Sequence, residues 1–333
     1  MNGQNEQSGQ NRLSGIIIIN KPTDWTSHDV VARLRSILKM KRIGHGGTLD
    51  PLATGVLPIF VGRATRASEF SENADKEYIA ELQFGVTTDT QDITGNVLNT
   101  AEPKVTTEDL YSVIPQFLYE QKQIPPMYSA IKINGKKLYE LARRGEEVKR
   151  PPRDIYISEL EYISHFEQSQ ELVGISDEPN KNLSVKTQYK NNNSQLIEKA
   201  CLRVICSKGT YIRTLCHDIG NVLGCGAVMS NLQRTRAGNF KLEQSYTIEE
   251  VAEAALNNEL QKIIKPVDIL FENYPALHLD DINTKKCKNG THFFINNVAD
   301  GKYRVYSLTG EFLALSESKN NAIKPIKSFF EPI

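Results

Sequence analysis

The sequence predicts a chain of about two domains that mixes α-helices with β-strands, the second domain being small and rich in strands. The first observation is length, because 333 residues correspond to about two domains at the usual ~150 residues each. The second is composition: 39% hydrophobic and 24% charged residues are typical of a globular protein with a sizeable core. The third is that segments with helical spacing of apolar residues alternate with segments of period two.

The first half of the chain begins with an apolar, β-branched run at residues 16–19, which predicts a buried strand. Thr26 or Ser27 is expected to cap a helix, because the apolar residues that follow share one face. Residues 76–84 alternate between apolar and polar side chains, which predicts a half-buried strand. The other expected elements are a strand at 56–61, a short helix around 64–70, a loop at 87–95 and an amphipathic helix capped by Thr107.

The second half contains an Asn134-Gly135 turn signal, followed by an expected helix at 136–144. Two further strands are expected at 155–165 and 200–207, separated by a long polar excursion at 167–199 that we expect to be mobile. Prolines near residues 266 and 275 mark a domain boundary. The remaining expected elements are helices at 210–223 and after Thr247, and strands at 303–308 and 312–316 joined by a Thr309-Gly310 turn.

The stretch from Gly44 to Gly62 places one carboxylate, Asp50, after three glycines and directly before Pro51. Glycine allows close approach of another chain or a flat ligand, and proline holds the residue before it out of the helical region. The stretch therefore predicts a shaped loop that presents Asp50 and His45. The alternative is that Asp50 is an ordinary turn or helix-cap residue, since Asp is common in both places.

Basic residues are concentrated in three segments although the formal net charge is zero. Such segments are typical of a protein that binds a phosphate-rich partner. The alternative for each segment is a solvated helix face. The segments are residues 33–42, with Arg33, Arg35, Lys39, Lys41 and Arg42; residues 132–153, with eight basic residues against three acidic ones; and residues 203–241, with six basic residues against Asp218 alone.

The five cysteines form an odd set without a C-x-x-C pair, which favours reduced thiols. Cys216-His217 matches no common zinc-finger spacing, so no metal site is expected. No apolar run approaches the ~20 residues that a membrane span needs. Residues 1–12 are polar and are expected to be a disordered lead-in without a signal peptide, which favours a cytoplasmic location.

Taken together, these segments resemble the bacterial tRNA pseudouridine-55 synthases, over nearly the whole chain from about Gly15. No single motif is decisive, but their order along the chain is specific. The motifs are Asn20-Lys21-Pro22; Gly44-His45-Gly46-Gly47-Thr48-Leu49-Asp50-Pro51-Leu52-Ala53-Thr54-Gly55; Lys76-Glu77-Tyr78; residues 125–130; Gly135-Lys136-Lys137-Leu138-Tyr139; and Cys206-Ser207-Lys208-Gly209-Thr210-Tyr211-Ile212-Arg213. The polar excursion at 167–199 is longer than the resemblance leads us to expect.

The resemblance implies an α+β fold, with a catalytic domain at 13–273 built on a mixed, largely antiparallel sheet. It also implies an RNA-binding insertion at 124–153 and a PUA-like C-terminal domain at 275–333. The implied reaction isomerises a uridine in the TΨC loop of tRNA, and the base must first leave the stack. The resemblance implies that the protein requires no cofactor, no metal and no protein partner. It also implies a monomer.

The resemblance also assigns roles to individual residues. Asp50 matches the catalytic carboxylate, Arg213 the arginine that pairs with it, and Tyr78 the aromatic residue beneath the flipped base. His45 matches a residue that helps to hold the loop out, and Leu232 an apolar wall. The residues expected to bind the RNA are Lys21, Lys136, Lys137, Arg143, Arg144 and Lys208.

Three alternatives stay open at this point. A non-catalytic RNA-binding or tRNA-folding factor would suit the basic segments but has no need of Asp50 with Arg213. A thiolate enzyme using Cys206 or Cys216 would need a cofactor site, yet no glycine-rich nucleotide loop follows a strand. Relatives that act under guide-RNA direction share these motifs, but they normally carry partner-binding extensions.

Overall fold

The computed structural model describes residues 13–164 and 196–330. The chain forms two compact units, one made of Met1–Lys76 together with Gln233–Ile333 and the other of Glu77–Leu232. The first unit is therefore discontinuous in sequence. The limits expected for the catalytic domain, 13–273, and for the C-terminal domain, 275–333, stay predictions. The expected lead-in at 1–12 and most of the polar excursion at 167–199 lie outside the described residues.

The first unit contains the predicted N-terminal strand, which pairs antiparallel with β3 along its whole length. β3 also pairs antiparallel with β2 and, through Thr54 and Gly55, parallel with the last part of β12. All of β3 after its first residue is buried, which fits its apolar sequence. The strands of this unit are β1 (Gly15–Lys21), β2 (Ile43–His45), β3 (Thr54–Val61), the end of β12 (Ala227–Ala237) and β13 (Phe240–Lys241).

Helices of the first unit begin where the sequence places their caps. Thr26 caps α2 (Ser27–Leu38) in a capping box with Asp29, and Thr247 caps α7 (Ile248–Leu256) in the same way. These two helices pack against each other. The shorter helical segments of the unit are η1 (Gly62–Ala67), α3 (Ser68–Asn73), η3 (Leu242–Gln244), α8 (Leu260–Ile263) and η4 (Val267–Phe271).

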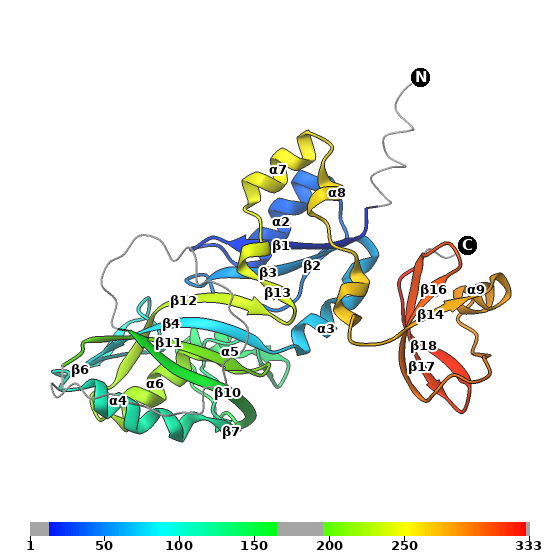
Figure 1. Cartoon of the computed structure of the whole chain (residues 1–333). Coiled ribbons are helices and arrows are strands. Elements are labelled where there is room, and N and C mark those ends of the chain that lie inside the picture. Colours follow the sequence, from blue (N-terminus) through cyan, green and yellow to red (C-terminus); the bar gives the residue numbers. More distant parts are fainter. Residues whose placement is uncertain (1–12, 165–195, 331–333) are drawn as a thin grey trace. The chain divides into compact units, whose positions relative to one another are not determined.

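The second unit is built on strands in the order β12-β4-β11-β10-β7 (Figure 1). Alternate residues of β4 are buried, as its period of two predicts. β10 and β11 pair antiparallel, as expected. The elements of this unit are β4 (Lys76–Phe84), β5 (Val86–Thr88), β6 (Val97–Thr100), α4 (Thr107–Val113), η2 (Ile114–Phe117), β7 (Tyr119–Gln123), β8 (Lys132–Ile133), β9 (Lys136–Lys137), α5 (Leu138–Ala142), β10 (Arg153–Ser164), β11 (Lys199–Cys206) and α6 (Ile212–Val222).

The C-terminal part of the chain forms its own sheet, ordered β14-β16-β17-β18-β15, next to one helix (Figure 1). Its core contains Leu313 and Phe293, whereas Leu315 and Phe329 belong to a second cluster that includes Phe271 and Phe60. The large mixed sheet and this separate sheet confirm the predicted α+β class. The elements are β14 (Ala276–Leu279), α9 (Asp281–Lys288), β15 (Phe293–Phe294), β16 (Gly301–Ser307), β17 (Phe312–Lys319) and β18 (Ala322–Ser328).

Several local predictions need correction. The cap of α4 is Thr106, not Thr107, because the Thr106 side chain accepts from the Asp109 amide. The helix expected at 136–144 begins only at Leu138, because Lys136–Lys137 pairs as a strand across the Asn134-Gly135 turn. No described helix is long and apolar enough to cross a membrane.

Candidate active site

The loop that carries Asp50 connects β2 to β3 in the first unit. Its glycines are needed: Gly47 has φ of +118°, and a Cβ on Gly55, whose φ is +99°, would lie 2.3 Å from the carbonyl oxygen of Arg234. The loop is also tied to the start of α2, since the Leu49 amide donates to Ser27 Oγ at 2.9 Å. Asp50 is half-buried. The arrangement is therefore a constrained loop that leaves a carboxylate partly accessible.

Lys21 lies at the end of β1 and is fully buried. Its Nζ donates to the carbonyl oxygens of Pro22 (2.8 Å), Trp25 (2.6 Å) and Pro51 (3.1 Å). Burial lowers its pKa to about 8, and the nearby carboxylate of Asp50 opposes this shift. A side chain without solvent exposure does not suit the RNA contact expected of Lys21, so we assign it a supporting role under the Asp50 loop.

His45 stands at the start of the same loop and is half-buried. Its ring lies edge-on to that of His28, with ring centroids 5.3 Å apart. Burial lowers the pKa of His45 to about 4, and His28 and Arg234 add to the shift. Its Nδ1 has no hydrogen-bond partner among the described residues. The imidazole is therefore neutral near pH 7 and suits an apolar or stacking contact.

Tyr78 and Leu232 lie on neighbouring strands of the second unit, β4 and β12. Tyr78 is 9% exposed and Leu232 is 5% exposed. Tyr78 occupies one of the buried positions of the alternating strand, on the same face as Ala80 and Leu82. Aromatic and apolar side chains are the types that contact a flat base.

Arg213 occupies the first turn of α6 and is 5% exposed. Its guanidinium donates to the carbonyl oxygens of Thr90 (3.0 Å) and Tyr128 (2.9 Å), and it lies 3.6 Å from a carboxylate oxygen of Asp92. These contacts come from two separate loops. Together they hold the guanidinium in one orientation.

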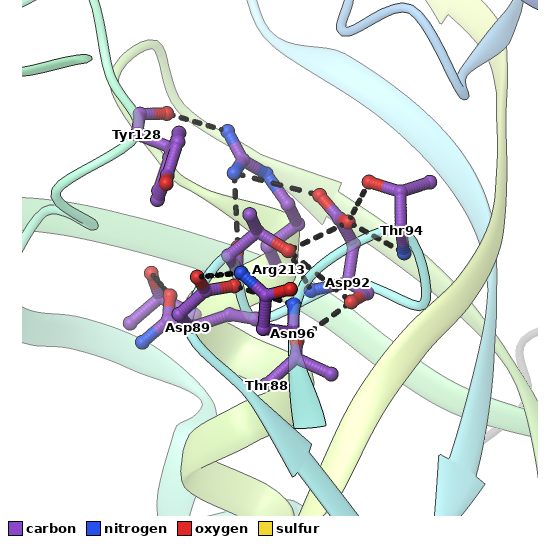
Figure 2. A network of polar contacts seen from close by, with 10 residues as sticks. Thr88, Asp89, Asp92, Thr94, Asn96, Tyr128 and Arg213 are labelled. Atoms are coloured by element: carbon purple, nitrogen blue, oxygen red, sulfur yellow. Dashed lines mark hydrogen bonds and ion pairs between the residues drawn. The ribbon is translucent and has the colours of Figure 1, made fainter. Parts of the chain in front are cut away.

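Asp92 is not among the residues predicted from the sequence. Figure 2 shows its carboxylate between Arg213 and Thr94. The oxygen Oδ1 accepts from Thr90 Oγ1 at 2.8 Å and from the Thr94 amide at 3.0 Å, and the side chain is only 6% exposed. Asp92 therefore helps to hold the guanidinium of Arg213 in place. The run of Thr and Asp at residues 87–94, interpreted above only as a loop, was the available signal.

The basic residues of the predicted insertion lie on the surface of the second unit. Lys136, Arg143 and Arg144 are exposed, and Lys137 and Arg143 both stack on the Tyr139 ring, 5.3 and 5.4 Å from its centroid. Lys208 is exposed in the turn before α6. Exposed cations held by an aromatic ring can contact phosphate. Within residues 13–164 and 196–330, no His, Cys, Asp or Glu side chains form a group that could hold a metal ion.

Solved structures share this fold. The chain superimposes on a chain of the crystal structure of a Cbf5-Nop10-Gar1 complex with a TM-score of 0.67 at 25% identity, covering 98% of this chain and 87% of that chain. A chain in a structure of an H/ACA RNP bound to a substrate RNA containing 2′-deoxyuridine matches with a TM-score of 0.66 at 24% identity, covering 99% and 88%. The fold class is that of the pseudouridine synthases.

Family models and curated relatives narrow this class. Residues 35–212 match the N-terminal domain of the TruB family of pseudouridylate synthases, and residues 213–272 match the tRNA pseudouridylate synthase B C-terminal domain. The tRNA pseudouridine synthase B of Clostridium kluyveri is 38% identical over 322 residues, which is 95% of this chain and 100% of the relative. That of Alkaliphilus oremlandii is 42% identical over 288 residues, covering 86% and 85%. The chain belongs to the TruB family of pseudouridylate synthases.

Proposed function

We propose that this chain converts uridine 55 in the TΨC loop of tRNA to pseudouridine, with Asp50 as the catalytic carboxylate. The observation that carries the proposal is the half-buried Asp50 on its constrained glycine loop, in a chain that belongs to this family. The names of the relatives support tRNA as the substrate. We further propose that the chain acts on tRNA in the cytoplasm, as a monomer and without a protein partner.

The chemistry requires a carboxylate and no redox partner. The bond from C1′ to N1 breaks, the uracil turns, and a bond from C1′ to C5 forms; C5 then loses its proton to solvent and N1 gains one. An ionised Asp50 can add to the base or to the sugar, or support a glycal route. Each of these routes begins from the same carboxylate.

The other site residues bind and orient. In this proposal Tyr78 lies under the flipped base and Leu232 forms an apolar wall, consistent with their burial on neighbouring strands. Arg213 orients the Asp50 carboxylate, and the contacts that fix its guanidinium support this role. His45, being neutral near pH 7, helps to hold the loop out.

RNA affinity is proposed to come from the insertion at 124–153 and from the C-terminal sheet. The exposed cations around Tyr139 suit phosphate contacts, which position the RNA without reading its sequence. Lys208 is proposed to contribute in the same way.

The rival functions have less support. A thiolate mechanism at Cys216 is disfavoured because the side chain is fully buried and burial raises the pKa of its thiol. Cys206 is buried as well. A non-catalytic RNA-binding factor would not need the ordered Arg213 and Asp92 arrangement.

The deciding experiment measures release of tritium from tRNA labelled at C5 of uridine, with the modified position then mapped. Release that maps to position 55 is the expected result. Absence of release from folded protein that binds tRNA would favour the binding factor, and release that maps elsewhere would contradict the assignment of the substrate.

A further inference from the structure

One of the largest fully buried side chains in the described part of the chain is an arginine, Arg234, on the last part of β12. It is 1% exposed. Taking a guanidinium out of water is costly unless its donors are satisfied. Such a group in a strand interior therefore indicates specific acceptors.

The acceptors of Arg234 are backbone carbonyl oxygens on both sides of Asp50. Nη2 lies 3.2 Å from the oxygen of Gly47, Nη1 3.4 Å from that of Thr48, and Nε 2.7 Å from that of Val56. Gly47 and Thr48 precede Asp50, and Val56 follows it. One rigid guanidinium thus joins the two ends of the loop that carries the carboxylate.

The backbone of Arg234 contacts the same loop. Arg234 pairs with Gly55 in the parallel register between β12 and β3. A Cβ on Gly55 would lie 2.3 Å from the carbonyl oxygen of Arg234, so the two strands approach as closely as glycine allows. The loop is held at its end by main chain as well as by the guanidinium.

Lys21 holds the loop from the other neighbour of β3 in the sheet, β1. Its ammonium donates to the carbonyl oxygen of Pro51, the residue after Asp50. Two buried cations from the two flanking strands therefore bind main-chain oxygens around one carboxylate. The two glycines of the loop, Gly46 and Gly47, would otherwise allow many conformations.

We propose that Arg234 is a positioning residue for the catalysis by Asp50. It fixes the direction of the carboxylate through the loop and makes no contact with RNA, since its side chain is buried. This inference rests on the proposed function, because it concerns the chemical step that Asp50 performs. Misplacement of a reacting group by about 1 Å can lower a rate by about 100-fold.

The test compares full-length wild type with Arg234→Lys and Arg234→Met. The matched controls are Arg236→Lys and Arg236→Met, two residues further along the same strand, where the side chain donates to the carbonyl oxygen of Gly238 outside the loop. For each protein, three quantities are measured: the melting temperature, the dissociation constant for tRNA, and the single-turnover rate of tritium release at saturating enzyme.

We expect Arg234→Met to bind tRNA within about twofold of wild type and to release tritium about 100-fold more slowly. Arg234→Lys keeps a cationic donor but loses the planar, two-armed geometry of the guanidinium. Its rate of tritium release should therefore lie between those of wild type and Arg234→Met. The Arg236 variants should keep the wild-type rate. If Arg234→Met does not fold, Arg234→Lys decides, with an expected loss of about tenfold at unchanged affinity.

Folded Arg234 variants with rates within threefold of wild type would overturn the inference and leave the proposed function intact. Equal losses of rate and of affinity, together with a lowered melting temperature, would also overturn it, because they indicate general structural support. No release by wild type itself would instead reject the proposed function.

Discussion

At the scale of the residue, the proposal that Asp50 is the catalytic carboxylate gives the most specific prediction. Asp50→Asn keeps the shape of the side chain and removes its charge, so it should form no detectable pseudouridine. An amide is a far poorer nucleophile and gives little support to a developing cation. Binding of tRNA should survive, because affinity comes mostly from phosphate contacts and stacking. The measurements are tritium release and filter binding on the same protein.

The turn-residue interpretation of Asp50 predicts the reverse. Asn is itself a good turn and cap former, so in that case Asp50→Asn would keep near-normal turnover. Substantial activity in the folded variant would therefore end the mechanism proposed here.

His45 gives a prediction for the dependence of stability on pH. Its pKa is lowered to about 4 in the folded chain, from the ordinary value of 6.5 for a histidine, chiefly by burial. A group with a lowered folded pKa contributes stability that is present above pH 6.5 and is lost as the pH falls towards 4, because the unfolded chain binds the proton first. Between pH 7 and pH 5 the loss should be about 2 kcal/mol.

The measurement is the free energy of unfolding at both pH values, for wild type and for His45→Gln. Glutamine does not titrate, so the variant should lose about 2 kcal/mol less than wild type over this interval. Equal losses in the two proteins would show that His45 is not kept neutral by the fold.

Residues of the site differ in how far the sequence could predict them. Asp50 is recognisable because all of its local constraints, the glycines and Pro51, are adjacent in the chain. Asp92 and Arg234 act through partners more than a hundred residues away, Arg213 and the Asp50 loop. No local sequence pattern predicts such a contact. The sequence around an arginine in a strand does not show whether its side chain is buried or exposed.

At the scale of the element, apolar periodicity predicted β4 and α2 well because each buries one regular face. It did not predict β7, whose polar sequence Tyr-Glu-Gln-Lys-Gln lies at the edge of the sheet. It also failed for β12, because Arg234 and Arg236 interrupt the apolar alternation with charges. Buried polar side chains whose hydrogen bonds are satisfied interrupt the apolar alternation, so the strand cannot be recognised from its periodicity.

The basic insertion carries a prediction at this scale. Changing Lys136, Lys137, Arg143 and Arg144 together to glutamine should weaken tRNA binding. It should also reduce the slope of log affinity against log salt by about 3, because each lost phosphate contact contributes about 0.7 to 0.9. Binding titrations over a range of salt concentrations measure both effects.

The control variant removes the same amount of charge outside the insertion. It changes four exposed lysines to glutamine: Lys104, Lys122, Lys199 and Lys262. The control variant should keep a slope close to that of wild type. An unchanged slope in the insertion variant would contradict the assignment of its cations to phosphate.

At the scale of the whole molecule, one compact unit contains both the N-terminal and the C-terminal part of the chain. The prolines near residues 266 and 275 predict a boundary there. In the structure, Leu315 and Phe329 share one apolar cluster with Phe271, Phe60 and Ile16. Turn signals are local, whereas this cluster depends on contacts between residues far apart in the sequence, so composition does not show it.

The shared cluster predicts that damage near the C-terminus destabilises the N-terminal strands. Phe329 is 6% exposed, and its ring lies 6.0 Å from that of Phe271. Phe329→Ala should lower the free energy of unfolding by about 3 kcal/mol, since removal of a buried Phe side chain costs about 3 to 5 kcal/mol. The single tryptophan, Trp25, lies between β1 and α2 and reports unfolding of the N-terminal part by its fluorescence. The urea midpoint of the Trp25 signal should therefore fall.

Phe294→Ala is the matched control, because Phe294 belongs to the same C-terminal sheet but is 66% exposed. It should change the free energy of unfolding by no more than about 0.5 kcal/mol. If Phe329→Ala leaves the Trp25 transition where it is in wild type, the C-terminal sheet unfolds independently and the cluster does not couple the two ends of the chain. If the transition moves only for Phe329→Ala, residues 13–76 and 233–330 unfold together.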